Sequence, residues 1–142
     1  MKKEIVASLS ELDRVVSCLD EVLPENAILF LRGDLAAGKT TLTQFIAKAK
    51  GIEGEVTSPT FSLQQCYGAK DGSMLYHYDL YRLEHEAFMQ MGLFEEFEKP
   101  GWHMVEWGSD KLETFLKAVG YCVILIEIES CRQKRKYTIE SC

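Results

Sequence analysis

The sequence predicts an α/β fold, in which helices flank a mixed, largely parallel central sheet to give three layers. Residues 27–31 are all apolar, as is typical of a buried parallel strand. Apolar residues then recur at helical spacing over residues 39–50. A second pair of the same kind follows, with an apolar segment at residues 102–106 and a helical pattern at residues 110–119. Two strand–helix units of this type indicate helices on both faces of a sheet.

The remaining segments supply further strands and helices. Residues 3–7 can form a short strand, and Ser10 is expected to cap the following helix because acidic residues occupy its first turn. Pro24 ends that helix. Four more strands and two helical segments are predicted: strands at 61–67, 73–78, 121–129 and 136–139, a helix at 84–91 and a helical turn at 92–97.

Length and charge restrict the class of protein. The 142 residues fit a single domain over residues 1–142, and the net charge of −6 argues against a chain that holds nucleic acid by itself. The five cysteines are odd in number and include no C-x-x-C pair, so a disulfide framework or zinc site is not expected. Because no apolar run approaches a membrane span and no signal sequence is recognisable, a cytoplasmic location is expected.

Residues 33–41 read G-D-L-A-A-G-K-T-T and directly follow the apolar strand. The pattern G-x-x-x-x-G-K-[ST] between a strand and a helix predicts a phosphate-binding loop, whose backbone and helix N-terminus cradle a nucleotide triphosphate. Lys39 supplies a cation for the outer phosphates, and the Thr40 hydroxyl is placed to ligate Mg²⁺. The predicted nucleotide-binding residues in this loop are Gly33, Asp34, Leu35, Ala36, Ala37, Gly38, Lys39, Thr40 and Thr41.

Two acidic residues stand where predicted strands end. Asp79 follows the strand at residues 73–78, and Glu106 ends the strand at residues 102–106. A carboxylate in this position can bind a metal or orient an attacking water, although it can also simply cap a neighbouring loop. Beside the phosphate loop, the catalytic interpretation is favoured for both residues.

Other polar and aromatic residues have two possible interpretations. Thr57, Ser58 and Thr60 form either an ordinary polar loop or a switch in which a threonine reaches Mg²⁺ when the terminal phosphate is present. His77 lies in strand alternation, which favours a core or sheet-face histidine over a catalytic base. Trp107 follows Glu106 and is expected to pack, to shield the site or to meet a partner.

Four blocks together resemble one family. They are G-D-L-A-A-G-K-T-T at 33–41, T-S-P-T-F at 57–61, H-Y-D-L-Y-R at 77–82 and V-E-W at 105–107. Their order and spacing are similar to those of the bacterial TsaE (YjeE) family of small P-loop ATPases. The resemblance implies a P-loop NTPase-like fold with ATP and Mg²⁺ as cofactors. It also implies that the chain binds TsaD and TsaB type proteins and hydrolyses ATP slowly while they make threonylcarbamoyladenosine in tRNA, which it meets only through that complex.

The family's residue roles transfer to matching positions of this sequence. Lys39 would hold the phosphates, while Thr40 and Glu106 would hold the metal. Asp79 would support the metal or the water, and Thr60 would belong to a switch loop. Three further assignments are implied: Trp107 and Arg82 for shielding or partner contact, and Ser10, in the stretch 8–11, for contact near adenine.

One position departs from the family pattern. The family usually carries glycine where this chain has Ala36. If that position requires a positive φ, the Cβ costs about 1–2 kcal/mol, so Ala36→Gly is expected to tighten nucleotide binding.

Two alternatives to an accessory ATPase remain open from the sequence. One is a nucleotide-dependent binding switch without significant hydrolysis. The other is a small-molecule kinase, although kinases usually add an Arg-rich lid. No arginine finger is obvious, and Arg82 and Arg135 are candidates by position alone.

Overall fold

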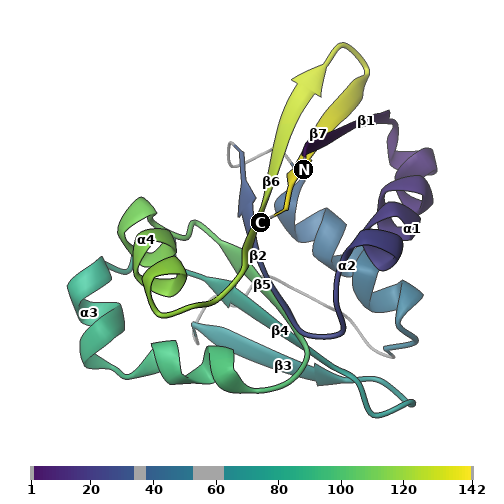
Figure 1. The fold of residues 1–142 in the computed structure, drawn as a ribbon. Coiled ribbons are helices and arrows are strands. Elements are labelled where there is room, and N and C mark those ends of the chain that lie inside the picture. The colour runs from purple at the N-terminus through teal and green to yellow at the C-terminus, as the bar shows by residue number, and fades with distance from the viewer. Residues whose placement is uncertain (1, 34–37, 53–62, 142) are drawn as a thin grey trace.

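The computed structural model describes residues 2–33, 38–52 and 63–141. Strands and helices alternate along most of the chain (Figure 1). In order, the elements are β1 (Lys2–Ala7), η1 (Leu9–Glu11), α1 (Leu12–Val22), β2 (Ala27–Arg32), α2 (Lys39–Ala49), β3 (Gln64–Gly68), β4 (Met74–Asp79), α3 (His85–Gln90), η2 (Leu93–Glu98), β5 (Trp102–Glu106), α4 (Asp110–Ala118), β6 (Val123–Cys131) and β7 (Lys134–Glu140).

The strands form one seven-stranded sheet in the order β1-β7-β6-β2-β5-β4-β3. The four central strands run parallel, because β2 pairs with both β5 and β6 while β4 pairs with β5. At the two edges, β1 and β7 on one side and β3 on the other add antiparallel pairs. The carboxyl ends of the parallel strands therefore all lie at the same end of the sheet, which is where ligands bind in open α/β folds.

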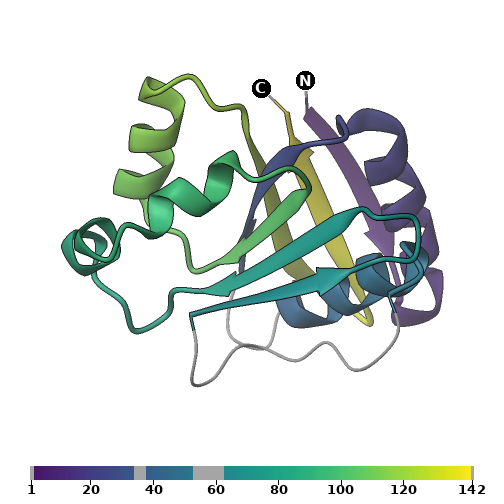
Figure 2. The ribbon, with the colours of Figure 1, turned by 90° about the horizontal axis from the view of Figure 1, so that it is seen from below.

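Helices cover both faces of this sheet (Figures 1 and 2). On one face α1 and α2 pack with an apolar core that includes Leu12, Val15, Leu19, Leu42 and Ile46. On the other face α3, η2 and α4 enclose a second core that includes Tyr78, Phe88, Phe97, Leu112 and Leu116. The predicted three-layer α/β architecture is thus confirmed.

Ser10 does not cap the first helix: the helical segment begins two residues earlier than expected, with η1, and Ser8 is the capping residue. The Ser8 amide donates to the Glu11 carboxylate at 3.0 Å, and its hydroxyl does so at 2.8 Å. These bonds lower the pKa of Glu11 to about 2. The acidic first-turn signal was therefore correct, but it belonged to a serine two residues earlier.

The cysteines do not form a framework of several disulfides within the described residues. Cys18, Cys66 and Cys131 are free thiols, whereas Cys122 is disulfide-bonded. Among the helices of the described part of the chain, none has the length and apolar character needed to cross a membrane.

Candidate functional site

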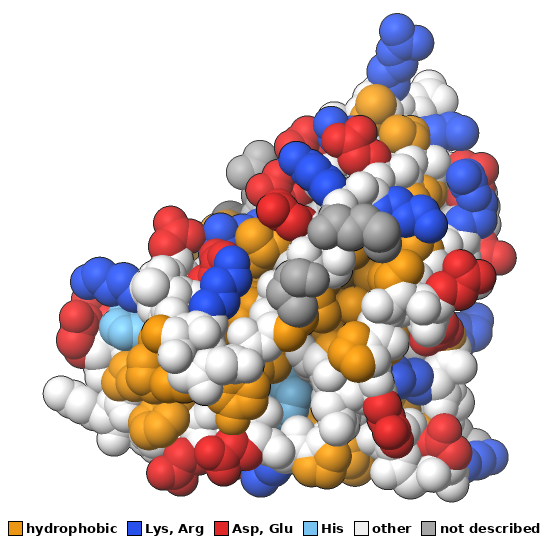
Figure 3. All heavy atoms as spheres, viewed as in Figure 1, with side chains coloured by type: hydrophobic (Ala, Val, Ile, Leu, Met, Phe, Trp, Pro, Cys, Tyr) orange, Lys and Arg blue, Asp and Glu red, His pale blue; other side chains and the backbone are white. Residues whose placement is uncertain are grey.

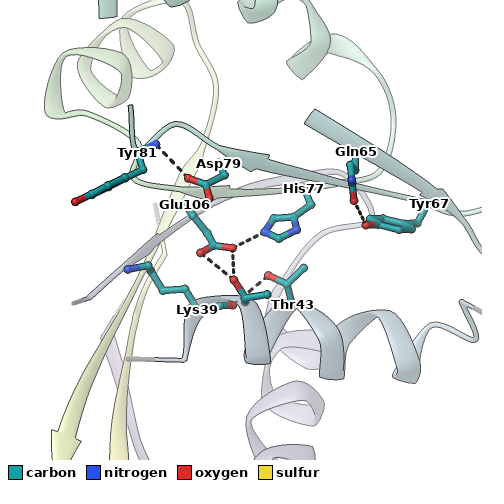
Figure 4. A network of polar contacts seen from close by, with 9 residues as sticks. Lys39, Thr43, Gln65, Tyr67, His77, Asp79, Tyr81 and Glu106 are labelled. Carbon is teal, nitrogen blue, oxygen red and sulfur yellow. Dashed lines mark hydrogen bonds and ion pairs between the residues drawn. The ribbon is translucent and has the colours of Figure 1, made fainter. Parts of the chain in front are cut away.

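Lys39 is the first residue of α2 and lies at the carboxyl end of β2 (Figure 4). Its side chain is only 3% exposed, an unusual burial for a lysine. The ammonium donates to the Gly33 carbonyl at 2.5 Å and lies 3.9 Å from the centre of the Trp107 ring. The ammonium is thus held between the Gly33 carbonyl and the face of the Trp107 ring, where a charge-assisted hydrogen bond and a cation–π contact compensate for lost hydration.

Glu106, the last residue of β5, faces the first turn of α2 (Figure 4). It is buried, and its two carboxylate oxygens accept from the Thr40 hydroxyl at 3.2 and 3.0 Å. The Nε2 atom of His77 bonds the same carboxylate at Oε2. The Thr43 hydroxyl, one turn along the helix, donates to the Lys39 carbonyl at 3.2 Å. The first turn of α2 therefore carries the Thr40 hydroxyl, in contact with the Glu106 carboxylate, directly after Lys39.

Trp107 adopts a positive φ of 61°, which is rare for a bulky residue. This conformation turns its ring back over Lys39, and the Tyr81 ring lies 4.8 Å away on the other strand end. Tyr81 is 51% exposed. Backbone strain of this kind concentrates at functional sites. The Trp107 ring therefore covers the ammonium of Lys39, and Tyr81 packs against that ring. Whether Trp107 shields a bound ligand or contacts a partner stays a prediction.

Asp79 lies beside Glu106, because the two residues are paired in the register of β4 and β5. One Asp79 carboxylate oxygen accepts from the Tyr81 amide at 3.1 Å and shapes the turn after β4. Arg82 follows in this turn and is exposed. The strand-end position of Asp79 is confirmed, whereas its part in metal or water binding and the role of Arg82 stay predictions.

Arg135 lies on β7, across the sheet from β4 and β5, and its side chain approaches Gly38 at the end of the phosphate loop. A Cβ built on Gly38 would lie 1.9 Å from Arg135 Nη1, so the guanidinium occupies the space next to this glycine. Gly38 caps α2 with a φ of 101°, a conformation that L residues with side chains rarely adopt. Glycine is therefore needed here both for the backbone and for the approach of the guanidinium.

Two cavities border the site. One of about 430 Å³ opens between the ends of β2 and β5 and is lined by Leu31, Arg32, Gly33, Trp107, Gly108, Ser109 and Asp110. Arg32 fixes its wall by pairing with Asp110 at 3.0 Å and Glu113 at 2.7 Å on α4. A smaller one of about 130 Å³ is lined by Ala7, Ser8, Leu9, Gln133, Lys134, Arg135 and Tyr137. Ser8 and Leu9, which line the second cavity with Arg135, belong to the stretch 8–11 expected near adenine, whereas Ser10 is not among its lining residues.

The oxygen donors fit a magnesium ion better than a transition metal. No cluster of three or more His, Cys, Asp or Glu ligands exists in the ranges that the structure describes. Magnesium in nucleotide sites instead takes one or two protein oxygens and completes its shell with phosphates and water. Thr40 and Glu106 offer such a pair of oxygen ligands, within 3.2 Å of each other.

The structure thus brings Gly33, Gly38, Lys39, Thr40 and Glu106 together at the helix N-terminus, with Thr41 half-buried in the same turn. Asp34, Leu35, Ala36, Ala37 and Thr60 lie outside the described residues, as do Thr57 and Ser58. Ser10 is exposed, with its hydroxyl 3.0 Å from that of Ser8.

Sequence reasoning undervalued two residues. His77 was expected to be a sheet-face or core residue, and it is fully buried, but it also contacts Glu106. Its spacing of two residues from Asp79 indicates that the two side chains share a face of the strand, but the contact with Glu106 also depends on the pairing of β4 with β5. Arg135 was named as a candidate arginine finger by position alone, and its place beside Gly38 depends on the pairing of β7 with β1 and β6.

Comparison with known proteins agrees with this geometry. The family model described as "Threonylcarbamoyl adenosine biosynthesis protein TsaE" matches residues 6–137. The chain belongs to the TsaE family. The resemblance of the four sequence blocks is thereby confirmed, and the match extends beyond them to most of the chain.

Individual TsaE relatives and one solved structure give the same result. The protein named tRNA threonylcarbamoyladenosine biosynthesis protein TsaE is 44% identical in Haemophilus influenzae, over 60% of this chain and 54% of that protein. The Bacillus subtilis protein of the same name is 40% identical, over 66% and 63%. These matches therefore span between half and two thirds of the relatives' length. The crystal structure of Bacillus subtilus YdiB superposes with a TM-score of 0.68 at 28% identity, covering 99% of this chain and 87% of that one.

Proposed function

We propose that this TsaE family member is a Mg²⁺-dependent ATPase that hydrolyses ATP slowly and acts on TsaD and TsaB type proteins in tRNA threonylcarbamoyladenosine synthesis. The observation that carries the proposal is the convergence of Lys39, Thr40 and Glu106 at the N-terminus of α2. The pathway assignment is supported by family membership and by the printed names of the relatives.

The chain's own residues would bind the phosphate chain from three directions. Amides at the N-terminus of α2 point along the helix axis and carry its positive dipole end. Lys39 would exchange its bond with the Gly33 carbonyl for a phosphate oxygen. Arg135 would add a guanidinium from the β6–β7 side, where it already lies against Gly38. The small cavity beside Arg135 is the proposed place for adenine.

Magnesium, when bound, would neutralise charge on the outer phosphates. Thr40 and Glu106 would hold it. Asp79, next to Glu106 in the sheet, is the proposed group to orient the attacking water. Hydrolysis by the chain alone would be slow if a partner must complete the site, because an arginine supplied by a partner raises the rate of such enzymes by orders of magnitude. The aromatic pair of Trp107 and Tyr81 lies at the rim, where a partner could reach it.

Replacement of Lys39 tests the site assignment. Lys39→Ala should reduce phosphate release from ATP below detection, because the cation for the transferred phosphate is lost. Lys48→Ala is the matched control, since Lys48 is an exposed lysine on the same helix. Thermal melts of both variants would show that they fold. Wild-type release by folded Lys39→Ala would contradict the assignment, and a phosphorylated small molecule in place of free phosphate would favour a kinase.

A further inference from the structure

His77 lies at the centre of β4 and is 0% exposed. Its ring points from the sheet toward α2 and meets the carboxylate of Glu106 on the neighbouring strand (Figure 4). Because the carboxylate is an acceptor, Nε2 carries the proton and donates. The other nitrogen, Nδ1, is buried and has no hydrogen-bond partner among the described residues.

If His77 served packing alone, it would lower the stability of the fold relative to an apolar residue at this position. Leaving a buried polar atom unpaired costs about 1–3 kcal/mol. The adjacent positions of β4 hold buried Tyr76 and Tyr78, and Leu75 two residues earlier on the same face is fully buried. An apolar side chain would fill the space without an unpaired nitrogen. The bond to Glu106 is therefore the property that distinguishes histidine at this position.

That bond controls how the carboxylate is rotated. The terminal torsion of a glutamate is soft and roughly two-fold, so its oxygens exchange places unless partners fix them. Oε2 of Glu106 accepts from both His77 and Thr40, whereas among the described residues Oε1 accepts only from Thr40. In Figure 4 the oxygen that His77 does not bond lies on the side of Lys39. One oxygen is thus anchored and the other faces the phosphate-binding side.

We propose that His77 is a positioning residue for the divalent cation: it anchors Oε2 so that Oε1 and the Thr40 hydroxyl are presented together as ligands. The inference rests on the proposed function and adds to it a residue that determines cation affinity. Groups that orient metal ligands in this way change metal affinity by about 10- to 100-fold when they are removed.

The test separates the donor of His77 from its volume. His77→Met fills a similar space without a donor, whereas His77→Gln can place an amide N–H near the position of Nε2. His77→Asn is the matched amide whose shorter side chain falls short of that position. Calorimetric titration with a non-hydrolysable ATP analogue, in EDTA and at increasing Mg²⁺, gives the nucleotide affinity and the half-saturating Mg²⁺ concentration without any turnover. His85→Met serves as a control on α3.

The expected result is a selective loss. His77→Met and His77→Asn should bind the analogue in EDTA as the wild type does, but require at least about tenfold more Mg²⁺. His77→Gln should recover most of the wild-type Mg²⁺ response, and this Gln–Asn contrast is decisive if His77→Met does not fold. An unchanged Mg²⁺ requirement in folded His77→Met or His77→Asn, or an equal loss of binding in EDTA, would overturn the inference alone. Failure of the wild type to bind the analogue would overturn the proposed function and the inference with it.

Discussion

Arg135 and Lys39 place two positive charges beside the N-terminus of the same helix. Cations are unfavourable there, because the positive end of the helix dipole repels them. An anion bound at this helix end would be stabilised by both charges. Arg135→Ala should therefore weaken binding of an ATP analogue by about tenfold or more, which is the loss of affinity expected when one hydrogen bond to a charged group is removed. Isothermal titration measures this.

The matched control for Arg135 lies in the same hairpin. Arg132 is an exposed arginine at its turn, so Arg132→Ala makes the same change in net charge away from the loop. We expect this variant to bind nearly as the wild type does. Equal losses in the two variants would mean that Arg135 acts only through long-range charge.

Residues whose role depends on local sequence could be predicted, and residues placed by long-range pairing could not. Lys39 and Thr40 belong to a loop whose residue spacing predicts phosphate and Mg²⁺ binding. Glu106 ends a strand that the apolar pattern predicts. Arg135 reaches Gly38 because β7 lies between β1 and β6, an order that no local pattern contains.

At the scale of single elements, β5 is anchored by a buried histidine. His103 donates from Nε2 to the Lys99 carbonyl at 2.8 Å, and its Nδ1 accepts from the Tyr78 hydroxyl at 2.6 Å. Burial lowers the pKa of His103 below its usual value. The folded protein therefore resists a proton that the unfolded chain accepts near pH ~6.5, so this stabilisation is complete above about pH 6.5 and lost as the pH falls below it.

Replacement of His103 tests this account of acid sensitivity. His103→Gln should lower the free energy of unfolding at pH ~8, yet flatten its decline between about pH 7 and pH 5. Urea unfolding at several pH values measures both effects. The other two histidines are present in both proteins, so the difference isolates His103. Parallel pH profiles would show that His103 does not contribute.

Elements with strong local signals were predicted to within a few residues. The strand at residues 102–106 corresponds to β5 without change, and α2 ends one residue before its expected end. The start of the first helix was misplaced because two serines near it can cap, and only the geometry of Glu11 selects Ser8.

At the scale of the whole molecule, charges of both signs are interspersed over the face shown in Figure 3. Together with a net charge of −6, this distribution is unlike the basic surface that nucleic-acid binding requires. It supports the proposal that partner proteins, and not this chain, hold the tRNA. Under this proposal, ATP hydrolysis by the chain would serve a complex of proteins that itself holds the tRNA.

The measurement that tests this account most directly is phosphate release from ATP and Mg²⁺, with and without TsaD and TsaB type proteins. We expect slow release by the chain alone, an increase of roughly tenfold or more with both partners, and none above background from Lys39→Ala in either condition. Absence of release by the wild type in both conditions, or equal release by Lys39→Ala, would contradict the account.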